Sequence, residues 1–171
     1  NLQLVKKICK NKNIKLIEDA SESLGTIYSH GNFKDLHTGT IGDLGIVSFN
    51  GNKILTTGGG GALLINNKNI SEKARYLLNQ AKDDSILYRH NEVGYNFTMS
   101  NIHAAIGLAQ IEKFDKILIK KKNIRKWYEY YLGKENLYPL PQYAINNCWF
   151  NILKLKKPHT QSMLVSMVQK L

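Results

Sequence analysis

Cysteine is scarce in this chain of 171 residues, which contains only Cys9 and Cys148. The two lie far apart and lack the close spacing of a metal-binding pair, so we expect free thiols in a reducing, cytoplasmic environment. No apolar run reaches the roughly 18 residues that a membrane-spanning helix needs, so we expect no membrane partner.

An initiator methionine is also absent, and helix-like stretches stand at both ends, at 1–13 and 163–171. These features predict an internal fragment of a longer protein. The length suits one ordinary domain. Because 43% of the residues are hydrophobic, a buried core is feasible and wholesale disorder is not expected.

Acidic residues are few, 13 against 24 lysines and arginines, which gives a net charge of +11. Most of the excess lies late, with 12 basic and four acidic residues over 111–171. One interpretation is a basic module that binds nucleic acid. We favour a lysine-rich solvated helix, because the basic run at 120–126 lies inside a helical pattern rather than in a flexible arm. Such a face could also attract an anionic substrate.

Hydrophobic periodicity predicts an alternation of helices and short buried strands. Helices are expected over 2–10, 70–81 and 100–132, with Ser71 and Ser100 as caps, and strands at 14–17, 44–50 and 61–67. Residues 82–99 have no clear period and are expected to form a long functional loop. An apolar stripe is expected on the last helix, formed by Phe114, Ile117, Ile124, Trp127 and Tyr131. From about residue 134, strands of a smaller second unit are expected.

Two acidic residues, Glu18 and Asp19, fall at the carboxyl end of the first expected strand. In open parallel sheets, ligands bind at the carboxyl ends of the strands. The pair is therefore a candidate part of a binding site.

The stretch SFNGNKILTTGGGG, at 48–61, places Lys53 before four consecutive glycines. A nucleotide-binding phosphate loop needs the lysine after the glycines, at the start of a helix, whereas here a strand is expected to follow. A dinucleotide-binding fingerprint fails for the same reason. The five histidines, at positions 30, 37, 90, 103 and 159, share no ligand spacing, so no metal site is predicted.

Covalent catalysis is a further possibility for Lys53, because a buried or crowded lysine can form a Schiff base with pyridoxal phosphate. That cofactor needs a carboxylate for its ring nitrogen and hydroxyl and N–H groups for its phosphate. The sequence offers Asp19 at a strand end, Ser48 five residues before Lys53, and the glycine-rich loop as candidates for these roles.

Three segments carry a resemblance to a known family: EDASESLGT at 18–26, GTIGDLGIVSFNGNKILTTGGGGALL at 39–64, and VGYNFTMSNIHAAIGLAQIEKFD at 93–115. Over roughly residues 13–132 the chain resembles the DegT/StrS-type sugar aminotransferases. These are pyridoxal-phosphate enzymes with the α/β aspartate-aminotransferase (type I) fold. The first two segments look most like the enzymes that aminate UDP-4-keto-6-deoxy-N-acetylglucosamine on the way to legionaminic-type sugars.

The resemblance implies a role for each matching residue. Lys53 would be the Schiff-base lysine and Ser48 the phosphate-binding serine. Asp19 would pair with the ring nitrogen, and Glu22 would stand where relatives contact the ring hydroxyl. Asn96 would reach the cofactor phosphate of a neighbouring subunit, which implies a homodimer with shared active sites.

Two positions depart from the family pattern. Many relatives have Gln or His at the position of Glu22, and Arg at the position of Thr98. An acid at position 22 would alter the electronics around the cofactor or face the substrate. Arg89 is a candidate substitute for the missing arginine.

The function implied is transfer of an amino group, from glutamate, to a 4-keto nucleotide sugar. Residues 1–115 would complete the cofactor-binding large domain, and 116–171 would form a linking helix and the start of the small domain. The alternatives are a sugar dehydratase of the same fold, which Lys53 disfavours because that group carries His there, and an inactive truncated homologue. The keto sugar, the amino donor and the stereochemistry stay open.

Overall fold

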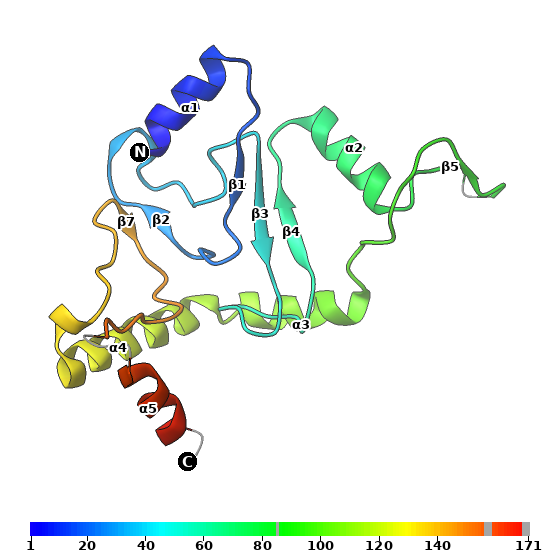
Figure 1. Cartoon of the computed structure of the whole chain (residues 1–171). Helices are drawn as coiled ribbons and strands as arrows, with labels where there is room; N and C mark the ends of the chain where they lie inside the picture. The colour runs from blue at the N-terminus through cyan, green and yellow to red at the C-terminus, as the bar shows by residue number, and fades with distance from the viewer. Residues whose placement is uncertain (85, 156–158, 169–171) are drawn as a thin grey trace.

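A three-stranded sheet lies at the centre of the chain, in a computed structural model that describes residues 1–84, 86–155 and 159–168 (Figure 1). Its strands are β1 (Ile17–Asp19), β3 (Leu44–Ser48) and β4 (Gly61–Leu64), in the order β1-β3-β4. β1 runs parallel to β3, whereas β4 is antiparallel to β3. β1 and β3 therefore both end at the same edge of the sheet. The first strand begins later than predicted and includes both acidic residues.

Within the described ranges, five α-helices surround or extend this sheet. They are α1 (Leu2–Asn11), α2 (Lys68–Leu78), α3 (Asn101–Ile111), α4 (Phe114–Leu132) and α5 (His159–Val168). α3 and α4 run across the end of the sheet toward which β3 points (Figure 1). Among the described residues, none of the helices is both long and apolar enough to cross a membrane.

Two helix boundaries differ from the sequence prediction. The cap of α2 is Asn67, whose side chain accepts a hydrogen bond from the Ile70 N–H at 3.1 Å, so the predicted Ser71 cap is wrong. Asn67 follows the turn after β4 directly, so the helix begins there. The predicted helix over 100–132 is interrupted at 112–113 and forms two helices. The predicted Ser100 cap is confirmed.

Short antiparallel pairs complete the fold. β2 (Ile27–Tyr28) pairs with β7 (Ala144–Ile145), and β5 (Lys82–Asp84) pairs with β6 (Arg89–His90) inside the predicted loop. Two 3-10 turns, at Gly31–Phe33 and Lys134–Asn136, are η1 and η2. The β2–β7 pair joins the two predicted domains, whose division at 115–116 stays a prediction.

The predicted apolar stripe of α4 is only partly buried. Trp127 and Tyr131 are 62% and 77% exposed, and the buried residue of this helix is instead Arg125. The Arg125 guanidinium donates to the Glu129 carboxylate at 2.7 Å and to the Tyr138 carbonyl at 3.2 Å. The basic run at 120–126 thus contributes one arginine to the interior, which weakens its interpretation as a nucleic-acid surface.

The core includes residues of the turn that follows β3 and of the segment 137–149. Its buried apolar side chains include those of Leu55, Ile54, Leu137 and Trp149. Contacts of the late segment with the turn after β3 therefore shape the region around Lys53.

Candidate functional site

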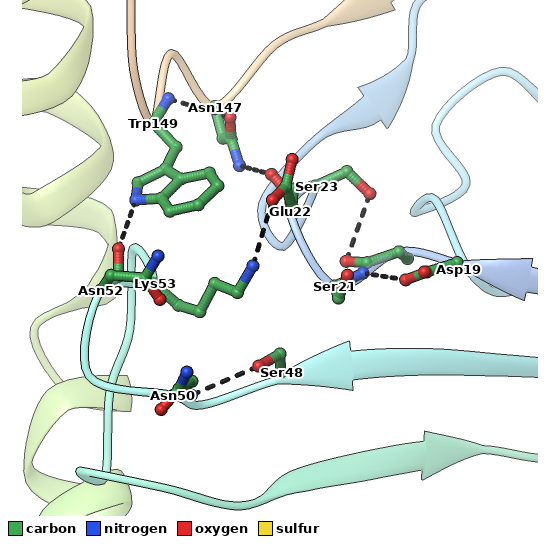
Figure 2. A network of polar contacts seen from close by, with 11 residues as sticks. Asp19, Ser21, Glu22, Ser23, Ser48, Asn50, Asn52, Lys53, Asn147 and Trp149 are labelled. Carbon is green, nitrogen blue, oxygen red and sulfur yellow. Dashed lines mark hydrogen bonds and ion pairs between the residues drawn. The ribbon is translucent and has the colours of Figure 1, made fainter.

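The ends of the two parallel strands place Asp19 and Ser48 at one edge of the sheet (Figure 2). Asp19 closes β1, and its Oδ1 accepts a hydrogen bond from the Ser21 N–H at 3.0 Å. Ser48 closes β3, and its Oγ accepts a hydrogen bond from the Asn50 N–H at 3.3 Å. Both residues are the last of their strands, at the carboxyl edge of the sheet where ligands of α/β proteins bind.

Glu18 serves the fold rather than the site. Because side chains alternate along a strand, Glu18 and Asp19 point to opposite faces. The Glu18 carboxylate accepts hydrogen bonds from the N–H groups of Ile41 and Gly42, both at 2.6 Å, and of Gly39 at 3.1 Å. It therefore anchors the loop before β3, and only Asp19 of the predicted acidic pair belongs to the site.

Lys53 lies on the turn after β3, with only 13% of its side chain exposed. Its Nζ is 3.2 Å from Glu22 Oε1 and 4.7 Å from the centre of the Trp149 indole ring. Figure 2 shows the lysine side chain reaching from its turn toward Glu22. The amino group thus lies close to both a carboxylate and an aromatic face.

The glycine run closes the loop that carries Lys53. The Phe49 N–H donates to the Gly60 carbonyl at 2.9 Å, and Gly60 has φ = +92°, a left-handed conformation that favours glycine. The Gln110 side chain of α3 donates to the Thr56 carbonyl at 2.7 Å and accepts from its N–H at 3.1 Å. The run therefore returns the chain into β4 and lets α3 hold the lysine loop in place.

Two residues of the site, Asn147 and Trp149, were missed by sequence reasoning. The Asn147 side-chain amide donates to the carbonyls of Glu22, at 3.0 Å, and Leu24, at 2.9 Å. The Trp149 indole N–H donates to the Asn52 carbonyl at 2.9 Å. Both lie beyond the motifs of the sequence resemblance, in a stretch without periodicity, so no local signal pointed to them.

The structure does not bring Asn96 to this cluster. Asn96 is exposed and forms a bridge with Asn79, just past the end of α2, on the side of the sheet away from β1. Arg89 lies in β6, paired with β5, which projects beyond α2 in Figure 1. Thr98 is exposed and lies, like Asn96, in the segment that connects β6 to α3. Of the five predicted site residues, Asp19, Glu22, Ser48 and Lys53 therefore lie together, whereas Asn96 lies outside this cluster.

Hydrogen bonds from the Ser21 side chain and N–H lower the pKa of Asp19 below its ordinary value of 3.8, and the charge of Lys53 adds to this effect. Because the folded-state pKa is the lower one, the carboxylate stabilises the fold above about pH 4, and this contribution disappears as the pH falls through the folded-state pKa.

We expect carboxyl ¹³C NMR to give Asp19 a lower pKa in the wild type than in Ser21→Ala. An unchanged value in Ser21→Ala would contradict the prediction.

The side chains at this sheet edge fit the chemical groups of pyridoxal phosphate. Lys53 offers a shielded amine for the aldehyde, and Asp19 offers a carboxylate that stays ionised, as a protonated ring nitrogen requires. Ser48 offers a hydroxyl at the start of the loop that carries the lysine. The α/β fold and this arrangement are consistent with an aminotransferase.

The particular family follows from comparison with known proteins. The model of the DegT/DnrJ/EryC1/StrS aminotransferase family matches residues 1–170, and the chain belongs to this family. Its members are aminotransferases that use pyridoxal phosphate.

Curated relatives include the proposed pyridoxal phosphate-dependent aminotransferase EpsN of Bacillus subtilis (strain 168), 42% identical over 151 residues, which cover 86% of this chain and 38% of EpsN. GDP-perosamine synthase of Caulobacter vibrioides is 39% identical over 127 residues, which cover 74% of this chain and 33% of the synthase. The chain thus spans between about a third and two fifths of the length of these relatives.

Among solved structures, the Helicobacter pylori aminotransferase PseC, involved in pseudoaminic acid biosynthesis, superposes with a TM-score of 0.82. The match covers 99% of this chain and 46% of PseC at 21% sequence identity, and it confirms the predicted fold class.

Proposed function

We propose that this chain is part of a pyridoxal-phosphate-dependent enzyme that transfers an amino group, from glutamate, to the keto carbon of a 4-keto nucleotide sugar. The observation that carries the proposal is the shielded Lys53 amine at the edge of the sheet where Asp19 and Ser48 end parallel strands. Family membership supports the reaction class. Relatives whose names contain GDP-, UDP- and dTDP-linked amino sugars support a nucleotide sugar and leave the nucleotide open.

When bound, pyridoxal phosphate supplies an aldehyde that condenses with amines and a ring that accepts an electron pair from the substrate carbon. Lys53 would hold the cofactor at its aldehyde carbon. As a free amine, Lys53 would take a proton from the substrate carbon and return it later, as general base and acid.

The other site residues would hold and orient the cofactor. Asp19 would keep the ring nitrogen protonated, and the Ser48 hydroxyl would donate a hydrogen bond to the phosphate. Glu22, whose carboxylate lies 3.2 Å from the Lys53 amine, would approach the ring hydroxyl of a cofactor held by that lysine.

We further propose that the complete protein is a cytoplasmic homodimer in which Asn96 serves the partner's site. The position of Asn96, exposed and away from Lys53, suits a residue that acts across an interface. α3 offers apolar side chains for such an interface, since Ile102 and Leu108 are 74% and 61% exposed. The free thiols of Cys9 and Cys148 suit the reducing cytoplasm.

Cofactor trapping tests the proposal directly. The full-length protein is mixed with pyridoxal phosphate, reduced with borohydride and digested, and the modified peptide is identified by mass spectrometry. We expect the adduct on Lys53, because the site gathers a carboxylate and a hydroxyl around that amine. Lys68, whose side chain is 87% exposed, is the internal control for non-specific labelling. An adduct spread evenly over exposed lysines, or none at all, would count against the proposal.

A further inference from the structure

Trp149 contacts the amine of Lys53 although it lies 96 positions further along the chain. Its ring centre is 4.7 Å from Lys53 Nζ, within the range of a cation–π interaction. The other contact of the amine is the Glu22 carboxylate at 3.2 Å. That carboxylate is 61% exposed, and an exposed ion pair alone is too weak to hold a lysine in one place.

Three contacts hold Trp149 in place. The indole N–H donates to the carbonyl of Asn52, the residue directly before Lys53, at 2.9 Å. The Trp149 backbone N–H donates to Asn147 Oδ1 at 3.0 Å, and the Phe150 ring packs against the indole with centres 4.1 Å apart. Because Trp149 is only 9% exposed, its ring has little room to turn. The face that it presents to Lys53 is therefore set by the fold.

Asn147 connects Trp149 to the loop that carries Glu22. Its side-chain NH₂ group donates to the Glu22 and Leu24 carbonyls, while its side-chain Oδ1 accepts from the Trp149 backbone N–H. Figure 2 shows the resulting chain of contacts from Glu22 through Asn147 to Trp149 and Asn52. One short segment, 147–149, thus supplies the indole that contacts the amine and holds the backbone of the residue whose carboxylate contacts it.

From these contacts we propose that Trp149 is a positioning residue for Lys53, whose amino group it holds between the indole face and the Glu22 carboxylate. The inference rests on the proposed function, because positioning matters for an amine that must meet an aldehyde. A reacting group misplaced by about 1 Å can lose about 100-fold in rate. Trp149 would thus restrict the lysine to the side of the turn on which Glu22 lies.

The first readout is the position of the amine in solution. Reductive methylation with ¹³C-formaldehyde labels the lysines and keeps their charge, and Lys53→Arg assigns the Lys53 resonance. We expect the Lys53 methyl protons upfield of those of the other lysines, because they lie over the indole. The shift should vanish in Trp149→Leu and persist in Trp149→Phe, while Trp127→Leu, at a 62% exposed tryptophan of α4, leaves it unchanged.

The second readout is the rate at which Lys53 captures pyridoxal phosphate under cyanoborohydride, measured by mass spectrometry on folded full-length variants. We expect Trp149→Leu to slow capture about tenfold or more, a part of the loss that a 1 Å misplacement causes. Trp127→Leu should capture at the wild-type rate. Recovery in Trp149→Phe would assign the effect to the aromatic face, and its absence would assign it to the indole N–H anchor.

Wild-type capture by Trp149→Leu, or an unshifted methyl resonance in the wild type, would overturn the inference. If Trp149→Leu fails to fold, the wild-type methyl resonance decides, because it must lie upfield if the indole holds the amine. If no variant captures the cofactor, the wild type included, the proposed function fails, and the methyl resonance alone decides whether Trp149 holds the amine.

Discussion

Replacing Lys53 with alanine is expected to abolish amino transfer to the keto sugar in the full-length enzyme. The substitution removes the amine that would hold the cofactor and the group that would move the proton at the substrate carbon. A positioned acid or base alone contributes about 10²–10⁴-fold to a rate, so we expect kcat to fall at least about 10³-fold. The measurement is NMR detection of the amino sugar formed from glutamate and a 4-keto nucleotide sugar.

Two variants control this experiment. Lys53→Arg keeps the positive charge near Glu22 but not the nucleophilic amine, so it should be as inactive as Lys53→Ala. Lys68→Ala removes an exposed lysine whose 3.7 Å pair with Glu72 lies on the surface of α2, and it should keep wild-type activity. A Lys53→Ala enzyme within tenfold of the wild type would refute the assignment of the catalytic lysine.

Replacing Gly45 with alanine is expected to destabilise the fold by about 3 kcal/mol or more, at the upper end of overpacking effects. Gly45 is buried in β3, and an added Cβ would overlap the carbonyl oxygen of Gly39 and lie 2.9 Å from its Cα. The Gly39 loop cannot yield easily, because the Glu18 carboxylate holds its N–H groups. Urea unfolding, with the slope compared between variants, measures the change.

Gly51→Ala is the matched control. Gly51 is exposed, has no positive φ, and an added Cβ would meet no atom within 4 Å. We expect its free energy of unfolding to stay within about 0.5 kcal/mol of the wild type. Equal stability of the two alanine variants would show that the Gly39 loop moves freely, contrary to the contacts described.

The sequence was most informative where chemistry and periodicity acted locally. The fold class was predicted from motifs around Lys53, Ser48 and Asp19, and α1 and the Ser100 cap followed from local patterns. The helix boundary at 112–113 was missed because the helical spacing of apolar residues continues on both sides of it.

Long-range contacts could not be predicted in the same way. The apolar pattern of α4 suggested a buried Trp127, whereas the fold buries Arg125, whose partners Glu129 and Tyr138 neutralise its charge and satisfy its donors. Trp149 belongs to the site only because its segment folds back onto residues 22–53. Periodicity carries no information about such pairing.

The contacts of Asn147 and Trp149 also bear on when the Lys53 region becomes ordered during synthesis. The Asn147 amide bonds join residues 125 and 123 positions apart, and the indole bond spans 97 positions. We expect contacts of such sequence separation to form late, because the entropy of closing the intervening chain must be overcome first. A nascent chain that ends before residue 147 can pair β1, β3 and β4, but it lacks the groups that fix Glu22 beside Lys53. We therefore expect incomplete chains to lack a positioned Lys53 amine.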